Sequence, residues 1–310
     1  MKWNWTENKF FLCRGYGTKK ESPFRQCYQN LHEFICLLDH NTRYAVFTAT
    51  ATPVTKNRIF QTLGLNRFNT FCLEKSPLKD NIKFSVTNIG NDTSIENLFE
   101  LLINEISVKK EHAKRILIYC QSRTQCAIIW QTFAASLGSK LYMGGTRDLK
   151  KRLVEMFHAG TPSEVKEHIM INATNADSCL RIIICTIAFG MGINCRGFNT
   201  VIHFGPSKDI ELYVQECGRA GRDGTQSICY LLCNSLLSSR TSDDMKEYLL
   251  SNECKRETIG KLFSSASKRS FCPCCDICVK ECECDVNRSC QELLTFQKKV
   301  KLPVVKKKDW

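Results

Sequence analysis

The middle of the chain alternates between short apolar runs and longer stretches in which apolar residues recur at helical spacing. The apolar runs, short enough for strands, are residues 115–120, 153–157, 180–185, 200–204 and 228–233. The stretches with helical spacing are residues 98–106, 122–137, 209–217 and a segment that begins at Ser163. Continuous apolar strands suit a sheet buried on both faces, and regular alternation with helices suits parallel strands. We therefore predict an α/β domain with a parallel sheet and helices on both faces.

Capping residues define one of these helices more sharply. Ser122 directly precedes the stretch that runs to Leu137, and Gly138 follows it. Serine is a favoured residue before the first helical turn, and glycine commonly ends a helix. A helix is therefore predicted between them, whereas the asparagine-rich stretch from Asn172 to Ser178 is predicted to be a loop.

The pattern changes on both sides of the alternating region. Residues 1–23 show no regular spacing, and they are followed by a helical pattern at 28–38, a short strand at 44–47 and a helix at 55–63. Near the other end, residues 238–263 are charged and helical in pattern, residues 272–290 are dense in cysteine, and the last dozen residues are rich in lysine. These changes predict segments at 1–83, 84–236, 237–290 and 291–310.

The net charge favours a polyanionic partner. The formal charge is +13, and each lysine or arginine placed on a phosphate releases condensed counterions. A basic surface that serves solubility is the alternative. The lysine-rich end of the chain, Lys298–Lys301 and Lys306–Lys308, is consistent with a nuclear-import signal, a DNA-contacting arm or a solvated end.

The cysteine content points to metal binding inside the cell. The chain has 20 cysteines, but the polar and aromatic residues 1–10 lack the apolar core of an export signal, and no stretch is apolar enough for a membrane helix. A reduced, intracellular protein is therefore expected. Its clustered cysteines are interpreted as metal ligands, and the scattered ones as small buried apolar residues, namely Cys13, Cys36, Cys120 and Cys185.

The most specific local pattern is the segment from Gln215 to Gly224, which contains Gly-Arg-Ala-Gly-Arg-Asp-Gly. Its two arginines can project from one side of a turn, and its glycines let the backbone approach a ligand closely. Guanidinium groups suit phosphate because they donate in a rigid fork. Taken alone, the segment also fits a glycine-rich turn with solvated arginines.

Other segments occur with it in a fixed order, and together they resemble the helicase motifs of the RecQ family of superfamily 2. The segment at 215–224 resembles motif VI. The other matching segments are 48–51 (motif III), 118–123 (motif IV), 157–160 (motif IVa) and 186–194 (motif V), with Val201–Phe204 also fitting between motifs V and VI. The resemblance covers residues 24 to 280. It implies a RecA-like second motor lobe at 84–236, the end of the first lobe before it and a small helical zinc-binding module at 237–290.

The resemblance also implies roles for individual residues. In this family ATP and Mg²⁺ lie between two lobes, and the second lobe supplies an arginine finger that stabilises charge in the transition state. Arg222 corresponds to that finger, with Arg219 and Gln215 at the nucleotide or bracing the finger, and Asn194 near the ribose. Arg123 and Thr186 correspond to contacts with the DNA backbone. For Thr186 a hydroxyl that caps the next turn is the alternative.

Cysteine spacing gives the second strong signal. Cys272, Cys275 and Cys278 form C-x-x-C-x-x-C, and Cys254 supplies a fourth ligand one helix upstream, as structural tetrahedral zinc requires. This layout resembles the zinc module of RecQ helicases, and free or disulfide-linked thiols are the alternative. Four further cysteines lie in this region, Cys274, Cys282, Cys284 and Cys290. They would form a second metal site or act as extra thiols near the first. Cys274 would alternatively replace one of the predicted ligands.

Two features of the family are not found in these 310 residues. The pattern G-x-x-x-x-G-K-[ST] of a phosphate-binding loop does not occur, and neither does the acidic box that holds magnesium. About twenty residues follow Cys290, too few for a winged-helix domain.

The expected function is a RecQ-like ATP-dependent 3′–5′ DNA helicase that is incomplete in this chain and does not turn over ATP alone. The alternative is a non-catalytic module that binds DNA or a partner. The expected partners are DNA, single-stranded or at an unwinding junction, and a first lobe or other repair proteins, with no membrane contact and a nuclear or otherwise intracellular location.

Overall fold

A computed structural model describes the chain in two compact units. The described residues are 9–12, 33, 36–38, 42, 44–145, 147–190, 195–265, 274–281, 292–293 and 295–296. Unit 1 comprises Met1–Pro77 and Lys261–Ser265, and unit 2 comprises Leu78–Gly260 and Ala266–Trp310. The predicted boundary at 83/84 therefore lies six residues after the division between the units.

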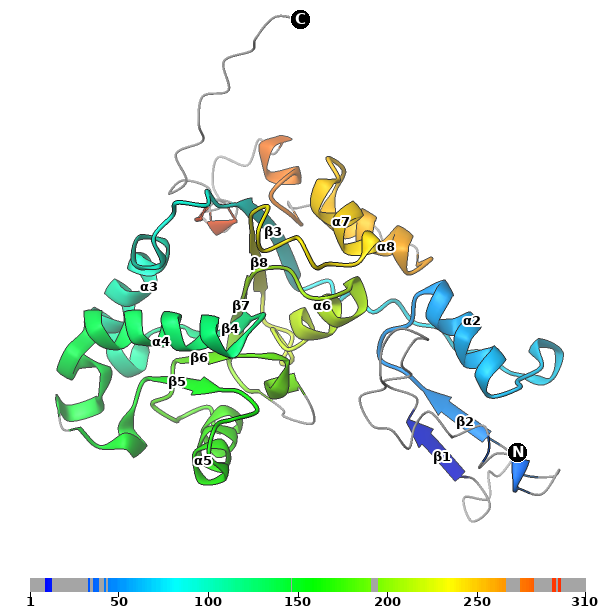
Figure 1. Ribbon diagram of the computed structural model, residues 1–310, viewed down its shortest axis with the longest axis horizontal. Helices are drawn as coiled ribbons and strands as arrows, with labels where there is room; N and C mark the ends of the chain where they lie inside the picture. The colour runs from blue at the N-terminus through cyan, green and yellow to red at the C-terminus, as the bar shows by residue number, and fades with distance from the viewer. Residues whose placement is uncertain are drawn as a thin grey trace, which may run out of the picture. The chain divides into compact units, whose positions relative to one another are not determined.

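A six-stranded sheet forms the centre of unit 2 (Figure 1). Its strands are β3 (Ile82–Asn88), β4 (Arg115–Cys120), β5 (Val154–Phe157), β6 (Ile182–Cys185), β7 (Phe198–Phe204) and β8 (Ser227–Cys233). Their order is β3-β8-β7-β4-β6-β5, and every neighbouring pair is parallel. The predicted α/β class with a parallel sheet is confirmed, and strands β4, β6 and β8 are almost wholly buried, as continuous apolar runs require.

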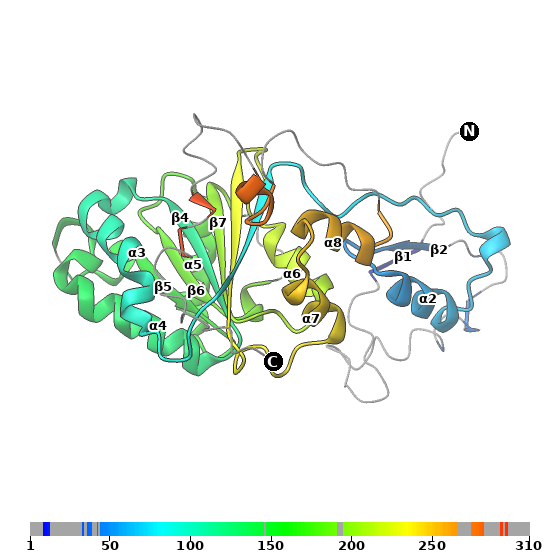
Figure 2. The same ribbon diagram turned by 90° about the horizontal axis from the view of Figure 1, so that it is seen from above.

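Helices connect and cover the strands of unit 2. They are α3 (Ile95–Lys109), α4 (Arg123–Leu137), α5 (Ser163–Thr174), α6 (Ile210–Cys217), α7 (Asp243–Leu250) and α8 (Lys255–Leu262). Helices α3 and α4 lie on one face of the sheet and α6 on the other (Figure 2). In α4 the predicted ends are confirmed, because Ser122 and Gln125 form a capping box and Gly138 takes a positive φ of 53° after the last turn. None of the described helices is both long enough and apolar enough to cross a membrane.

Two local predictions for unit 2 need correction. Helix α5 continues to Thr174, so the first three residues of the stretch Asn172–Ser178 are helical rather than a loop. Strand β3 was not predicted, because Lys83 and Ser85 interrupt its apolar residues. Both polar residues are nevertheless buried, and the strict alternation of apolar and polar residues from Ile82 to Thr87 is a strand pattern.

Unit 1 is described only in part, and two expectations about it were wrong. Strand β1 (Lys9–Leu12) pairs in parallel with β2 (Tyr44–Phe47), so residues 1–23 do contain a regular element. The predicted strand at 44–47 is confirmed, and α2 (Pro53–Thr62) begins two residues earlier than expected, with Thr52 accepting the amide of Thr55. Cys36 is exposed rather than buried, whereas Cys120 and Cys185 of unit 2 are buried as expected; Cys13 lies outside the described residues.

Residues near the end of the chain complete the core of unit 2. Leu293 and Phe296 are buried in the apolar cluster beneath α3 and α4. The hydroxyl of Ser85 donates to the Leu293 carbonyl at 2.6 Å, and the Phe296 ring packs edge-on against Tyr230 with the centroids 5.0 Å apart. Of the predicted tail at 291–310, the described residues Leu293 and Phe296 therefore belong to the core, whereas Glu292 is exposed.

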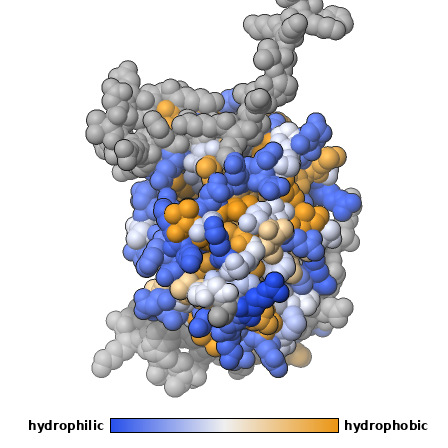
Figure 3. Space-filling view, turned by 90° about the vertical axis from the view of Figure 1, so that its left-hand side faces the viewer, coloured by the Kyte–Doolittle hydropathy of each residue, from blue (hydrophilic) through white to orange (hydrophobic). Residues whose placement is uncertain are grey.

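The outer face of α3 and α4 is mixed in character. Figure 3 shows apolar side chains in the middle of this face, interrupted by polar ones. The exposed large apolar residues of the two helices are Leu101, Val108 and Ile128. Such scattered apolar exposure is normal for a protein surface and indicates no binding site by itself.

The packing of Leu293 gives a stability prediction. We expect Leu293→Ala to lower the free energy of unfolding by about 2–5 kcal/mol, because it removes a fully buried side chain that the core cannot fully refill. Urea denaturation followed by circular dichroism measures the loss. Val108→Ala, at an exposed position, is the control and should change stability by less than about 0.5 kcal/mol. A loss below about 1 kcal/mol for Leu293→Ala would contradict the packing described here.

Candidate functional site

The carboxyl ends of the strands form one edge of the sheet, where two residues predicted to contact DNA lie. Arg123 begins α4 directly after β4, and Thr186 directly follows β6. Because parallel strands end at a common edge, the loops after β4, β5 and β6 are neighbours. Arg123 reaches the loop after β5, since a Cβ atom on Gly160 would lie 3.4 Å from both the Arg123 guanidinium and the His158 ring.

This edge carries fixed positive charge. Lys166 donates to the Ala159 carbonyl at 2.7 Å, which holds its ammonium on the loop after β5. Burial lowers the pKa of His158, and the nearby cations Arg123 and Lys166 lower it further. The loop therefore keeps a neutral imidazole between two permanent cations, an arrangement that suits an anion such as a phosphate.

Thr186 makes the capping contact that was the alternative to a phosphate contact. Its hydroxyl oxygen accepts the amide of Ala188 at 3.4 Å, and its carbonyl accepts the amide of Phe189 at 3.0 Å. The hydroxyl thus stabilises the turn after β6. Since the oxygen is the acceptor in this contact, its hydrogen can still be donated to a phosphate.

The arginines of the motif VI segment lie at the opposite edge of the sheet. Helix α6 begins after Asp209, whose side chain accepts the amide of Leu212, and ends at Cys217. The following residues 218–225, here called the arginine turn, lie where β7 starts, because the amide of Gly221 donates to the Phe198 carbonyl at 3.3 Å. The candidate finger, Arg222, is exposed on this turn.

Arg219 has a different environment from Arg222. It is buried, with 4% of its surface exposed, and lies beside the thiol of Cys195. Burial raises the pKa of that thiol, while Arg219 and Arg222 act to lower it. The residue that follows Asn194 is therefore next to the arginine turn, although Asn194 itself lies outside the described residues. Gln215 is half-buried on α6, two turns before the finger.

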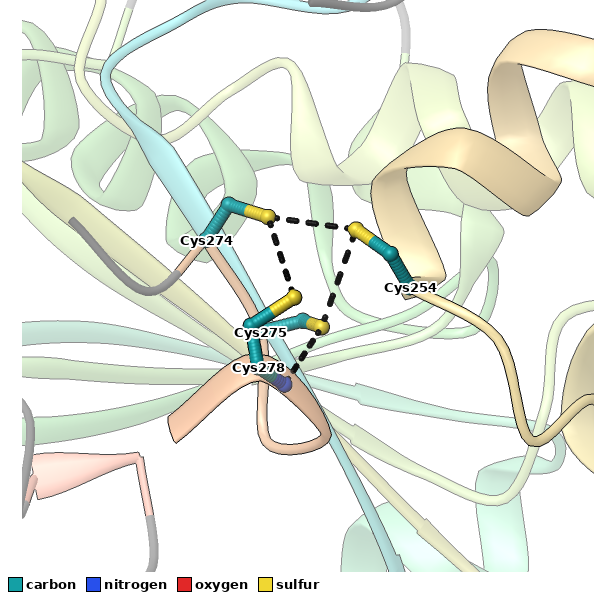
Figure 4. A group of neighbouring side chains, drawn as sticks. All are labelled: Cys254, Cys274, Cys275 and Cys278. Atoms are coloured by element: carbon teal, nitrogen blue, oxygen red, sulfur yellow. Dashed lines mark hydrogen bonds between the residues drawn. The ribbon is translucent and has the colours of Figure 1, made fainter. Parts of the chain in front are cut away.

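Four thiols gather at a third place in unit 2. The sulfur atoms of Cys254, Cys274, Cys275 and Cys278 all lie within 4.8 Å of one another (Figure 4). The Cys254–Cys274 distance is 3.2 Å, Cys274–Cys278 is 3.9 Å and Cys254–Cys275 is 4.0 Å. Three of these residues were predicted as ligands. The fourth predicted ligand, Cys272, lies outside the described residues, and so do Cys282, Cys284 and Cys290.

The geometry of this cysteine cluster fits a tetrahedral metal ion. Metal–sulfur bonds of 2.3 Å imply sulfur–sulfur distances of about 3.8 Å. The amides of Lys255 and Cys278 donate to the Cys275 sulfur at 3.4 and 3.5 Å, which stabilises a thiolate there. Hydrogen bonds from Cys274 and Cys275 also lower the pKa of Cys254. The cluster could therefore hold a metal that prefers thiolate ligands.

Comparison with known proteins supplies a family. A family model described as the helicase conserved C-terminal domain matches residues 95–224. The ATP-dependent DNA helicase Q-like 5 of Arabidopsis thaliana is 31% identical over 206 residues, which cover 65% of this chain and 20% of that protein. The RecQ-like DNA helicase BLM of Xenopus laevis is 33% identical over 186 residues, which cover 59% of this chain and 12% of that protein.

The chain contains a helicase C-terminal domain and is similar to helicases of the RecQ family of superfamily 2. A protein of Acanthamoeba polyphaga mimivirus, provisionally named an ATP-dependent RNA helicase, is 27% identical over 298 residues, which cover 90% of this chain and 50% of that protein. The chain thus spans half or less of the length of these three relatives.

Solved helicase structures agree with a RecA-like lobe. Dbp5 of S. cerevisiae, solved with RNA and ADP BeF3, superposes with a TM-score of 0.54 and 15% identity over 84% of this chain and 58% of that one. A structure of Mss116p gives a TM-score of 0.51 and 13% identity over 74% of this chain and 44% of that one. The predicted RecA-like fold is confirmed.

Sequence reasoning missed a buried polar group in this lobe. The Glu216 carboxylate on α6 accepts the Ser207 hydroxyl at 2.6 Å and lies 3.0 Å from Nε2 of His203 on β7. The His203 ring also stacks on Tyr119 of β4. A glutamate and a histidine inside otherwise apolar segments were the available signal, because buried charge requires a partner. The group fixes α6, and with it the arginine turn, against the centre of the sheet.

Proposed function

We propose that this chain is the second motor lobe and the structural zinc module of an ATP-dependent 3′–5′ DNA helicase. The observation that carries the proposal is the separation of two cationic groups to opposite edges of one parallel sheet. Arg222 lies on a fixed turn at one edge, and Arg123 lies with its neighbours at the other. A motor that couples hydrolysis to movement along a strand needs separate contacts for the nucleotide and for the nucleic acid.

At the nucleotide edge, Arg222 is the candidate arginine finger. Its exposed guanidinium can donate to phosphate oxygens and stabilise the negative charge that develops during phosphoryl transfer. Arg219, being buried, is better suited to brace the turn than to contact the nucleotide. Asn194 and Gln215 remain candidates for contacts with ATP, and Mg²⁺ would be held by a first lobe that carries the phosphate-binding loop.

At the nucleic-acid edge, Arg123 and Thr186 would contact successive phosphates of one strand. The cations around Gly160 supply charge, and the Thr186 hydroxyl supplies a donor with a fixed direction. Contacts of this kind position the strand without reading its sequence. Single-stranded DNA or an unwinding junction is therefore the proposed partner, with DNA repair or recombination in the nucleus as the proposed setting.

The cysteine cluster is proposed to hold structural zinc. Four thiolates leave no open position for a substrate or water, so the ion would stabilise the fold rather than take part in chemistry. The ligands are Cys254, Cys275 and Cys278 with one thiol of the Cys-Pro-Cys segment. The family spacing favours Cys272 for that thiol, and the distances between the described sulfur atoms favour Cys274.

A non-catalytic module that binds DNA or a partner is the second candidate. In this candidate the cations beside the loop after β5 hold DNA without any coupling to ATP turnover. Both candidates require the cationic edge around Arg123, but only the first requires the arginine finger. Experiments on Arg123 and Arg222 therefore separate them.

Nucleic-acid binding provides the first test. We expect Arg123→Ala to weaken binding to single-stranded DNA about tenfold, because it removes one charge-assisted contact. Fluorescence anisotropy at several salt concentrations should also show the salt slope falling by about 0.7. Lys140→Ala, a cation just beyond the other end of α4, is the matched control and should leave affinity unchanged. Equal losses for both variants would contradict the proposed edge, and tighter binding to RNA of the same sequence would contradict the choice of DNA.

Turnover provides the second test. We expect the purified chain to show no DNA-stimulated phosphate release, and to gain it when a RecQ first lobe is added in trans. Arg222→Ala should then lower turnover about 1000-fold or more, because the finger stabilises transition-state charge. Arg240→Ala, another exposed arginine of the same unit, should change nothing. Failure to gain turnover would favour the non-catalytic module, and robust turnover by the chain alone that Arg222→Ala abolishes would overturn the expectation of an incomplete motor.

Metal analysis provides the third test. We expect about one zinc ion per folded chain, falling below about half an equivalent in Cys254→Ser, because a missing thiolate opens the site. Cys272→Ser and Cys274→Ser, compared side by side, identify the fourth ligand as the one whose loss releases zinc. Retention of zinc by Cys254→Ser would refute the four-thiolate site.

A further inference from the structure

The first residues of unit 2 are hydrogen-bonded to the arginine turn. Unit 2 begins at Leu78, and Lys79 and Asn81 follow directly. The Lys79 ammonium donates to the carbonyl of Gly218 at 2.8 Å and lies 3.5 Å from that of Ala220. Lys79 is far from the arginine turn in sequence but contacts it in space. Its side chain therefore helps to fix the position of the turn.

Asn81 makes further contacts to the turn. Its amide nitrogen donates to the carbonyls of Gly221 and Thr225 at 2.8 and 2.7 Å. The main-chain carbonyl of Asn81 accepts the main-chain amide of Ser227, the first residue of β8, at 2.8 Å. Lys79 and Asn81 together bind four carbonyl groups of the turn that carries Arg219 and Arg222.

These carbonyl groups need such partners. The last carbonyls of a helix have no intrahelical amide to bind, and a cation at this end also interacts favourably with the helix dipole. Lys79 supplies both a hydrogen-bond donor and a positive charge at the end of α6. Asn81 fits closely as well, because a Cβ atom on Gly221, which has a φ of 55°, would lie 2.4 Å from the Asn81 amide nitrogen. Only glycine allows this approach.

Electrostatics make the position of Lys79 relevant to Arg222. Burial lowers the pKa of Lys79, and the charge of Arg222 lowers it further, so the two cations lie near each other. Repulsion between like charges disfavours arrangements in which the Arg222 guanidinium folds back onto the Lys79 ammonium. Lys79 therefore restricts both the backbone of the turn and the directions open to its exposed arginine.

The same short segment is held from a second side. Arg256 of α8 is buried and donates to the carbonyls of Lys79 and Ile82 at 2.9 and 2.5 Å. It lies two residues after the thiol of Cys254. Residues 79–82 are thus fixed between the arginine turn and the helix that follows the first cysteine of the cluster.

We propose that Lys79 and Asn81 are positioning residues for Arg222, through which the segment that enters unit 2 sets the orientation of the arginine turn. A displacement of that segment then displaces the turn, because four carbonyl contacts join them. The catalytic part of this inference rests on the proposed role of Arg222 as a finger, whereas the structural part does not.

Hydrogen exchange measured by mass spectrometry on the full chain tests the structural part. Lys79→Met keeps the length of the side chain without its ammonium, and Asn81→Asp keeps its shape without the donor. We expect amides of residues 218–225 to exchange about tenfold faster in both variants, with the central strands unchanged. Lys79→Arg retains a donating cation and should restore slow exchange. Asp92→Asn, at an exposed position of the same unit, is the matched control.

Turnover with a RecQ first lobe added in trans tests the catalytic part. We expect Lys79→Met to lower kcat about tenfold or more with little change in KM, and Lys79→Arg to restore it. Faster exchange confined to the turn, without turnover in any variant, would leave the positioning contacts standing and refute the finger. Unchanged exchange in both variants, acceleration spread over the whole unit, or no rescue by Lys79→Arg would overturn the proposal.

Discussion

The common direction of six strands is the constraint on which the rest of this lobe depends. Because β3 to β8 are all parallel, every carboxyl end lies at one edge and every amino end at the other. Loops after the strands therefore bring together Arg123, His158 and Thr186, which are far apart in sequence. Segments that lead into the amino ends of the strands, such as the arginine turn before β8, lie at the opposite edge. Two chemically different edges follow from strand direction alone.

Helix α6 is the element that runs from one edge to the other. Its beginning lies just after the carboxyl end of β7, and its end carries the arginine turn. Glu216 attaches its inner face to His203 and Ser207 in a buried position. Leaving a buried polar group of this kind without its hydrogen-bond partner typically costs about 1–3 kcal/mol, so the helix has little freedom to tilt on its own. Movement of the turn is more easily produced by the segment at Lys79 and Asn81.

Local signals in the sequence predicted part of this arrangement. The apolar run at 115–120 and the caps Ser122 and Gly138 are encoded within a few residues, and the structure has β4 and α4 there. Contacts between distant residues left no such signal. Strand β1 forms only with its partner β2, which lies over thirty residues away in the sequence. Nothing in the residues around Asn81 indicates its contacts to the arginine turn. Cys274 is one of several clustered thiols, so spacing does not show that it meets the others. Spacing can show that four thiols are available, but their distances decide which of them meet.

The cysteine cluster is joined to the sheet by its backbone. Strand β3 is at the edge of the sheet, and an edge strand exposes unpaired amides and carbonyls. The amide of Phe84 donates to the Cys274 carbonyl at 3.0 Å, and the Phe84 carbonyl accepts the amide of Asp276 at 3.0 Å. The cysteine loop thus covers part of this edge. Since β3 continues directly from Lys79 and Asn81, an ion that fixes the loop would also stiffen the segment that holds the arginine turn.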